Sequence, residues 1–201
     1  MYDVISPVQV ITITVEKPGT KVKYPKLVCM DDRDVGININ KQILLLVQRL
    51  REEGDQPNTT VSITYTIKVN KNGVLSVIFL LDYYTAGAAH GMQVQKALTF
   101  STINGTCFPF PSLFRMNSYY KTRLSRYAKA YIKSENITLI EEYKGITDEQ
   151  EYYLTNDTLV LFYQLYEYTP YAYGFLEIPV PFEVVQTLVD KKSPIAQLTS
   201  R

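Results

Sequence analysis

The sequence has one histidine, two cysteines and no tryptophan in 201 residues. A zinc site built from several His and Cys ligands is therefore disfavoured, as is a zincin helix, which needs two His one turn apart. An excess of either charge is also missing, since 21 Lys and Arg against 20 Asp and Glu leave a formal charge of +1. Nucleic-acid-binding proteins and anionic membrane surfaces call for a basic excess. We therefore expect no metal, no cofactor and no nucleic-acid partner.

Long apolar runs are missing too. Residues 1–7 have no basic region followed by an apolar run, so they are not typical of a secretory signal. No stretch approaches the ~20 apolar residues of a transmembrane helix. The sequence as it stands predicts a cytoplasmic chain without direct membrane insertion, whereas removal of an export segment would leave an extracytoplasmic protein with this same sequence. Only in the second case do we expect that Cys29 and Cys107 could pair.

Tyrosine is what the chain has in excess. Its 17 tyrosines and 8 phenylalanines supply all the aromatic side chains. A tyrosine ring with its hydroxyl suits wet interfaces and sugar stacking as well as protein cores. The hydrophobic fraction of 46% and the charged fraction of 20% are those of a globular protein.

Hydrophobic periodicity predicts an α+β fold. Apolar residues alternate in five expected strands, at 8–16, 21–28, 59–69, 74–84 and 93–101. Helical spacing predicts two principal helices, at 38–53 and about 118–134, the first ended by Gly54 and preceded by a possible cap at Asp32 or Asp34. Later segments predict a short helical start at 147–151, a hairpin of 152–154 with 158–163, an extended edge at 177–181 and a short helix or turn at 182–189. We expect mainly antiparallel meander or hairpin sheets with the two helices packed on them.

The expected organisation is one compact structural unit with two subdomains. Residues 1–84 would form a strand-helix-hairpin subdomain and residues 85–189 a C-terminal subdomain. Residues 190–201 would be a polar, frayed tail.

His90 is the first candidate functional residue, because it is the only histidine and stands in the small-residue loop 85–91. A neutral imidazole could act as a general base, with Cys107 or a serine as nucleophile. No nucleophile-elbow or cysteine-protease context accompanies it. The other interpretations are a ligand contact and a structural role in tying the loop by hydrogen bonds.

The second candidate is the tyrosine-rich loop at 166–174, which reads YEYTPYAYG. Residues 163–173 contain five tyrosines, more than packing needs, so we expect two or three of them to be exposed. Glu167 is flanked by aromatic residues. It could bind a sugar, anchor an arginine of a partner, or be a buried acceptor that holds the loop shut. The candidate binding residues are therefore His90, Tyr166, Glu167, Tyr168, Tyr171 and Tyr173.

These same segments resemble a bacterial family of domains of unknown function. The resemblance rests on YLTNDTLVLFYQLYEYTPYAYG at 153–174, on IPVPF at 178–182 and on GAAHG at 87–91. Domains of this family form the extracellular part of the lysozyme-sensing anti-sigma factor RsiV and the N-terminal, non-catalytic part of the peptidoglycan deacetylase PdaC. The resemblance implies an α+β fold, export and a binding or sensing role. This sequence departs from the family's usual pattern at Ala88 and at Tyr168-Thr169.

Three functional hypotheses follow from the residues and the resemblance. The preferred one is a non-enzymatic binding or sensing module whose ligand is a protein or a cell-wall glycan. The first alternative is a cell-wall-related hydrolase that uses His90 as its base. The second is a structural or assembly protein that associates through sheet edges, and the sequence leaves the oligomeric state open.

Overall fold

The structure is a computed structural model that describes residues 5–199. The chain folds as two compact units, which divide between Cys107 and Phe108. Each unit is described by itself below.

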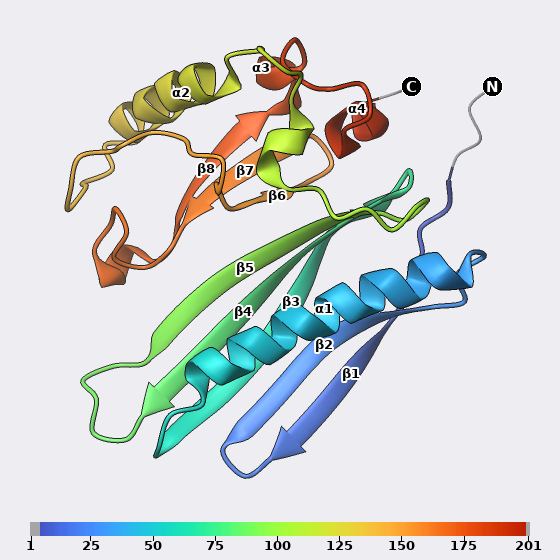
Figure 1. The fold of residues 1–201 in the computed structure, drawn as a ribbon. Helices are drawn as coiled ribbons and strands as arrows, with labels where there is room; N and C mark the ends of the chain where they lie inside the picture. Colours follow the sequence, from blue (N-terminus) through green and yellow to red (C-terminus); the bar gives the residue numbers. More distant parts are fainter. Residues whose placement is uncertain (1–4, 200–201) are drawn as a thin grey trace. The chain divides into compact units, whose positions relative to one another are not determined.

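The first unit is a five-stranded mixed sheet covered on one face by a long helix (Figure 1). The strands lie in the order β1-β2-β3-β4-β5. All neighbours are antiparallel except β2 and β3, which run parallel over Thr20–Val22. The elements are β1 (Gln9–Lys17), β2 (Thr20–Val28), α1 (Arg33–Gly54), β3 (Thr59–Lys71), β4 (Val74–Thr85) and β5 (Met92–Ser101).

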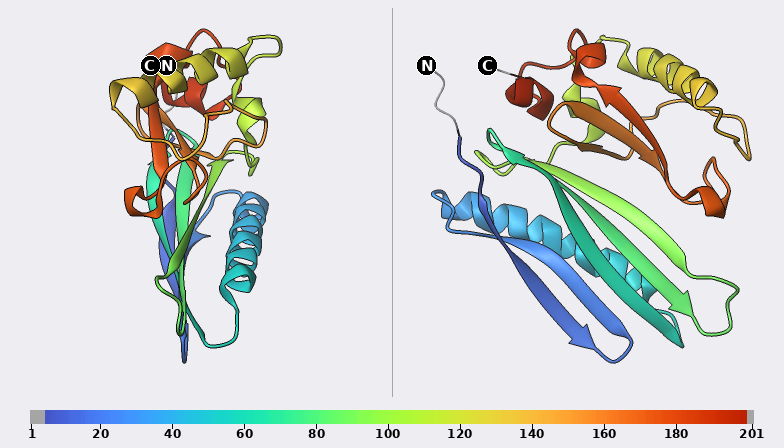
Figure 2. Two further views of the ribbon diagram at one scale, coloured as in Figure 1. Left: turned by 90° about the vertical axis from the view of Figure 1, so that its left-hand side faces the viewer. Right: turned by 180° about the vertical axis from the view of Figure 1, so that it is seen from behind.

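Helix α1 begins directly after its N-cap residue, Asp32. Asp32 accepts hydrogen bonds from the backbone N–H groups of Asp34 and Val35 at 2.9 and 3.1 Å, which satisfies two of the donors that a helix start leaves unpaired. The helix turns one apolar stripe toward the sheet, and the edge-on view of Figure 2 shows it lying along one sheet face. The buried core of this unit joins that stripe to β3, β4 and β5 through Ile39, Ile43, Val47, Ile63, Val77, Phe79 and Phe100, among others.

The antiparallel meander of β3, β4 and β5 follows from local sequence signals. Asn72 and Gly73 both have positive φ, 50° and 73°, as the two-residue turn between paired strands requires. Strand β4 has buried residues on both faces, among them Leu75 and Ser76, which agrees with its central position between β3 and β5.

The second unit is a three-stranded antiparallel sheet with a helix beside it. The sheet order is β6-β7-β8, and helix α2 contacts β8. Tyr127 of this helix donates a hydrogen bond from its hydroxyl to the carbonyl of Pro179 in β8, at 3.0 Å. The elements are η1 (Phe110–Leu113), α2 (Tyr120–Ser134), β6 (Tyr152–Leu154), β7 (Thr158–Tyr163), η2 (Tyr171–Tyr173), β8 (Leu176–Pro181), α3 (Phe182–Val185) and α4 (Pro194–Thr199).

The predicted α+β class is confirmed, with the meander, the later hairpin and both principal helices in place. The structure differs from the expectation in three segments. The first unit extends to Cys107 rather than ending at 84, because β5 pairs with β4 along its length. Residues 147–151 are irregular, and there Asp148 is held by Tyr120 and Lys121. The predicted polar tail contains α4, whose Ile195 and Leu198 are buried.

Among residues 5–199, no helix combines the length and the apolar character needed to cross a membrane.

Candidate ligand-binding surface

Three tyrosines of the second unit form a buried cluster beneath the tyrosine-rich loop. The rings of Tyr143, Tyr163 and Tyr168 lie with centroids 5.0 to 5.7 Å apart, at separations typical of packed aromatic rings. The hydroxyls of Tyr143 and Tyr163 share a hydrogen bond of 2.6 Å. Burial raises the pKa of Tyr143 to about 12 and also raises the pKa of Tyr163. Tyr168, a predicted binding residue, is therefore part of the core, because its ring packs against both of the others and is buried.

Hydrogen bonds close the loop that follows β7. The side chain of Glu167 accepts from the backbone N–H of Gln164 at 2.8 Å, and its own N–H donates to the Gln164 carbonyl at 3.2 Å. Tyr168 is tied down on the other side, because its carbonyl accepts from the N–H of Ile140 at 2.9 Å. Of the interpretations of Glu167, these contacts favour the one in which it holds the loop shut, although its side chain is exposed rather than buried.

The far end of the loop depends on one glycine. The short turn η2 is closed by hydrogen bonds from the N–H of Tyr173 to the carbonyl of Pro170 and from the N–H of Gly174 to the carbonyl of Tyr171. Gly174 has φ 83° and ψ −156°, a region that is essentially restricted to glycine. The carbonyl of Gly174 accepts from the hydroxyl of Thr169, which is buried. The loop is thus a defined structure and not a loose connection.

This construction presents three tyrosine rings, which we call the tyrosine surface: Tyr166, Tyr171 and Tyr173. Tyr166 is 47% exposed and Tyr173 is 49% exposed, while Tyr171 is half-buried. The rings of Tyr166 and Tyr171 lie 5.8 Å apart at an angle of 31°. Tyr166 has a positive φ of 63°, an uncommon conformation for a bulky residue that turns the chain at this point. Three rings of this loop are accessible, as the tyrosine excess predicts.

A second group of residues, which the sequence did not single out, belongs to this part of the unit. The half-buried Glu177 of β8 accepts a hydrogen bond of 3.2 Å from the hydroxyl of Tyr153. Burial raises the pKa of Tyr131 in α2, and the charges of Glu135, Tyr173 and Glu177 raise it further. Strand β8 buries Leu176 and Ile178. This alternation is the sequence signal from which an outward-facing Glu177 could have been predicted.

His90 lies in the first unit, on an exposed loop between β4 and β5. Its Nδ1 donates to the carbonyl of Gly91 at 2.8 Å. A side chain added at Gly91 would approach the carbonyl of Tyr83 to 3.1 Å, so the loop end packs closely on β4. These contacts favour the loop-tying interpretation of His90.

The environment of Cys107 does not favour the nucleophile role considered for it. Both Cys29 and Cys107 are free thiols. Burial raises the pKa of the Cys107 thiol, which lowers the fraction of reactive thiolate at neutral pH. In the described part of the chain, no three His, Cys, Asp or Glu side chains gather in a way that could hold a metal ion.

The fold and the surface together define an α+β protein whose second unit carries an exposed tyrosine loop between strands β7 and β8 of a small antiparallel sheet. Residues 111–183 match the family described as "Protein of unknown function (DUF3298)". The matched segment includes α2, the sheet β6-β7-β8 and the whole tyrosine surface.

Two solved structures of DUF3298 proteins are similar to the whole chain. One, from Bacteroides fragilis, is 16% identical with a TM-score of 0.68, and the match covers 99% of this chain and 98% of that one. The other, from Pseudomonas aeruginosa, is 12% identical with a TM-score of 0.70, covering 98% of this chain and 99% of that one. These likenesses show that the fold is shared over both units. No curated protein matches the sequence.

Proposed function

We propose that the protein is a non-enzymatic binding or sensing module that holds a protein or a cell-wall glycan on the tyrosine surface. The observation that carries this proposal is that the tyrosines within residues 163–173 fall into a buried group and an accessible group. Tyr163 and Tyr168 fill the core, whereas Tyr166, Tyr171 and Tyr173 are accessible on a loop that hydrogen bonds hold in place. Core packing accounts for the first two tyrosines, whereas the other three leave part of their rings accessible.

The loop is suited to binding because it is already ordered. A ligand that meets a preformed loop loses less conformational entropy on binding than one that must order it. Tyrosine adds a large contact area with few rotatable bonds and a hydroxyl for hydrogen bonding. A well-packed aromatic anchor contributes about 2 kcal/mol or more to an interface.

The acidic side chains near the rings indicate which chemical groups the ligand carries. Glu167 is exposed at the loop, and Glu177 is half-buried in the adjoining strand. Carboxylates accept hydrogen bonds and attract cations. We propose a ligand surface that carries basic side chains, if it is a protein, or several hydroxyls, if it is a glycan. Both fit stacking on tyrosine rings.

The resemblance to the extracellular domain of RsiV and the N-terminal region of PdaC supports this proposal and suggests the probes. We infer a ligand from the bacterial cell envelope or one that acts on it, which requires the protein to reach the outside of the cytoplasm. We propose no catalytic role for His90, whose ring is bonded to a neighbouring carbonyl.

The test is a calorimetric titration of the full chain with lysozyme and, separately, with soluble peptidoglycan fragments. We expect one of them to bind the wild type, and Tyr171→Ala to weaken that binding about 30-fold, which corresponds to about 2 kcal/mol. Tyr119→Ala is the matched control, because Tyr119 is 78% exposed in the same unit but stands outside the tyrosine surface. Absence of binding to both probes, or equal losses in the two variants, would contradict the proposal.

One observation favours the assembly alternative enough to test it. Strand β1 is an edge of the five-stranded sheet, and its Ile11 and Val15 are 46% and 40% exposed. Exposed edge strands can pair with another chain. Sedimentation velocity at micromolar concentration separates the two functions, since the binding module is expected to sediment as a monomer.

A further inference from the structure

Helix α2 is a local concentration of positive charge that the overall balance of +1 conceals. Its fifteen residues, YKTRLSRYAKAYIKS, contain five Lys or Arg and no Asp or Glu. Its apolar stripe is buried at Leu124, Ala128 and Ile132. The sides of the helix away from this stripe therefore carry the basic residues, which we call the basic face of α2.

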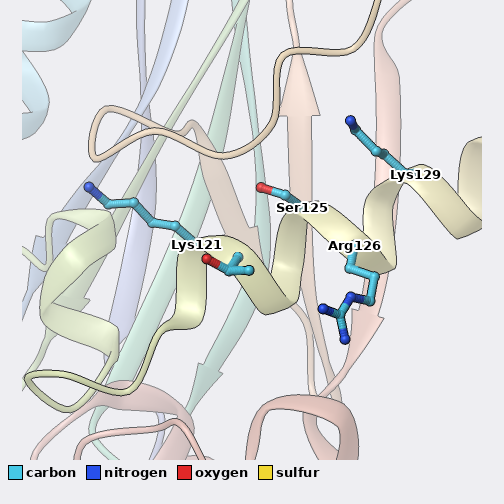
Figure 3. Close-up of a pocket in the computed structure, with 5 residues that line it drawn as sticks. Lys121, Ser125, Arg126 and Lys129 are labelled. Carbon is cyan, nitrogen blue, oxygen red and sulfur yellow. The ribbon is translucent and has the colours of Figure 1, made fainter.

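Part of this basic face lines a hollow of about 480 Å³ (Figure 3). Lys121, Ser125 and Lys129 stand four residues apart, so they follow one another on the helix at intervals of about 6 Å. Figure 3 shows these three side chains extending from one side of α2, with Arg126 extending from another side of the helix. The hollow is lined by Lys121, Thr122, Ser125, Arg126 and Lys129, so every residue that lines it can donate a hydrogen bond.

The segment that follows α2 sets the orientation of Ser125. The Ser125 hydroxyl accepts a hydrogen bond of 2.9 Å from the N–H of Ile146, which leaves its own proton to be donated to a ligand. Gly145 permits this approach. It has φ +100°, and a side chain added there would come within 2.9 Å of the Ser125 hydroxyl.

The cations that line the hollow differ in whether an acidic side chain pairs with them. Lys121 forms an ion pair of 2.5 Å with Asp148, and Asp148 also accepts from the hydroxyl of Tyr120 at 2.6 Å. Arg126 and Lys129 are exposed, and across residues 5–199 no acidic side chain lies within ion-pair distance of either. Lys129 and the Ser125 hydroxyl thus extend from the same side of α2 as Lys121, which a carboxylate holds, while Arg126 lines the hollow from another side of the helix.

We propose that this hollow binds phosphate groups of a linear phosphate polymer. A phosphate accepts hydrogen bonds on several oxygens and suits a cluster of lysine, arginine and hydroxyl donors. The spacing of donors along the helix suits an extended chain better than a single anion. A membrane surface fits less well, because the exposed face of α2 has no large apolar side chain to insert. Single-stranded nucleic acid fits less well, because no aromatic ring lines the hollow for base stacking.

The experiment is a calorimetric titration of the full chain with long-chain inorganic polyphosphate at low and moderate salt. We expect the double variant Arg126→Gln/Lys129→Gln to bind at least tenfold more weakly than the wild type. We expect Asp148→Asn to bind several-fold more tightly, because it releases Lys121. The matched control Lys41→Gln/Arg49→Gln removes two exposed cations from α1 and should leave the affinity unchanged.

Each outcome decides the proposal. Absence of polyphosphate binding, an equal loss in the α1 control, or no gain in Asp148→Asn would overturn it. So would equally tight binding of poly-glutamate, of oligo-deoxythymidine or of vesicles containing phosphatidylglycerol. Tyr171→Ala should bind polyphosphate like the wild type, so failure of this site and failure of the tyrosine surface are distinguishable.

Discussion

Replacing Gly174 by alanine tests whether the shape of the tyrosine loop is set by backbone conformation. The φ of 83° and ψ of −156° at this residue are unfavourable for any side chain, with a cost of about 1 to 3 kcal/mol. A Cβ at Gly174 would meet no atom within 4 Å. The loss of unfolding free energy is therefore expected to be this conformational cost alone, without a steric contribution.

Differential scanning calorimetry of the full chain measures the effect. For a domain of this size, 1 kcal/mol corresponds to about 4 to 8 °C in Tm, so the transition of the second unit should fall by roughly 5 to 20 °C. Affinity for whichever probe binds in the calorimetric titration, lysozyme or the peptidoglycan fragment, should fall by up to about tenfold, because the binding-competent loop becomes less populated.

Gly87→Ala is the matched control for this prediction. Gly87 also has a positive φ, of 90°, and open surroundings, but it lies in the loop between β4 and β5 of the first unit. It should leave the transition of the second unit and the ligand affinity unchanged. If Gly174→Ala leaves both quantities at their wild-type values, the loop is not held by its backbone conformation and the reasoning fails.

Three further predictions concern stability. Gly145→Ala should destabilise the chain more than Gly174→Ala in urea unfolding, because its positive φ is combined with a contact of 2.9 Å to Ser125; a smaller loss would contradict this. Because burial raises the pKa of Tyr143 from 10 to about 12, the unfolded state loses this proton first, and stability should fall between pH 10 and pH 12 by at most about 2 to 3 kcal/mol. Tyr143→Phe should flatten that part of the stability profile, and an unchanged slope would refute the assignment. Asp32→Ala should lower the stability of the first unit by about 1 kcal/mol through loss of the α1 cap, measured by urea unfolding with Asp31→Ala as control.

Local pattern sufficed for the elements whose partners are near in sequence. The meander β3-β4-β5 has alternating apolar residues and an Asn-Gly turn, and helix α1 has a regular apolar stripe after its capping Asp32. The parallel pairing of β2 with β3 could not be read this way, because α1 separates the two strands in sequence and the pairing covers only Thr20–Val22. Helix α4 could not be predicted either, because it is held by the tertiary packing of Ile195 and Leu198, while its neighbours in sequence are polar.

The candidate site divides in the same manner. Composition predicts that some tyrosines of the loop are exposed, but it cannot tell Tyr168 from Tyr166, because burial depends on Tyr143, which lies 25 residues earlier. Glu177 and Tyr131 escape notice because each stands in an otherwise ordinary strand or helix. The net charge does not reveal the basic face of α2, because acidic residues elsewhere in the chain bring the total to +1.

The most direct test of the tyrosine surface is an NMR titration of the full chain with ring-labelled tyrosine. Signals are assigned by single Tyr→Phe variants, and the added ligand is lysozyme or the peptidoglycan fragment that binds in calorimetry. The tyrosine surface predicts that the ring signals of Tyr166, Tyr171 and Tyr173 shift or broaden, while those of the buried Tyr143, Tyr163 and Tyr168 remain in place. Unchanged signals for the three exposed rings, with a bound ligand, would contradict the account.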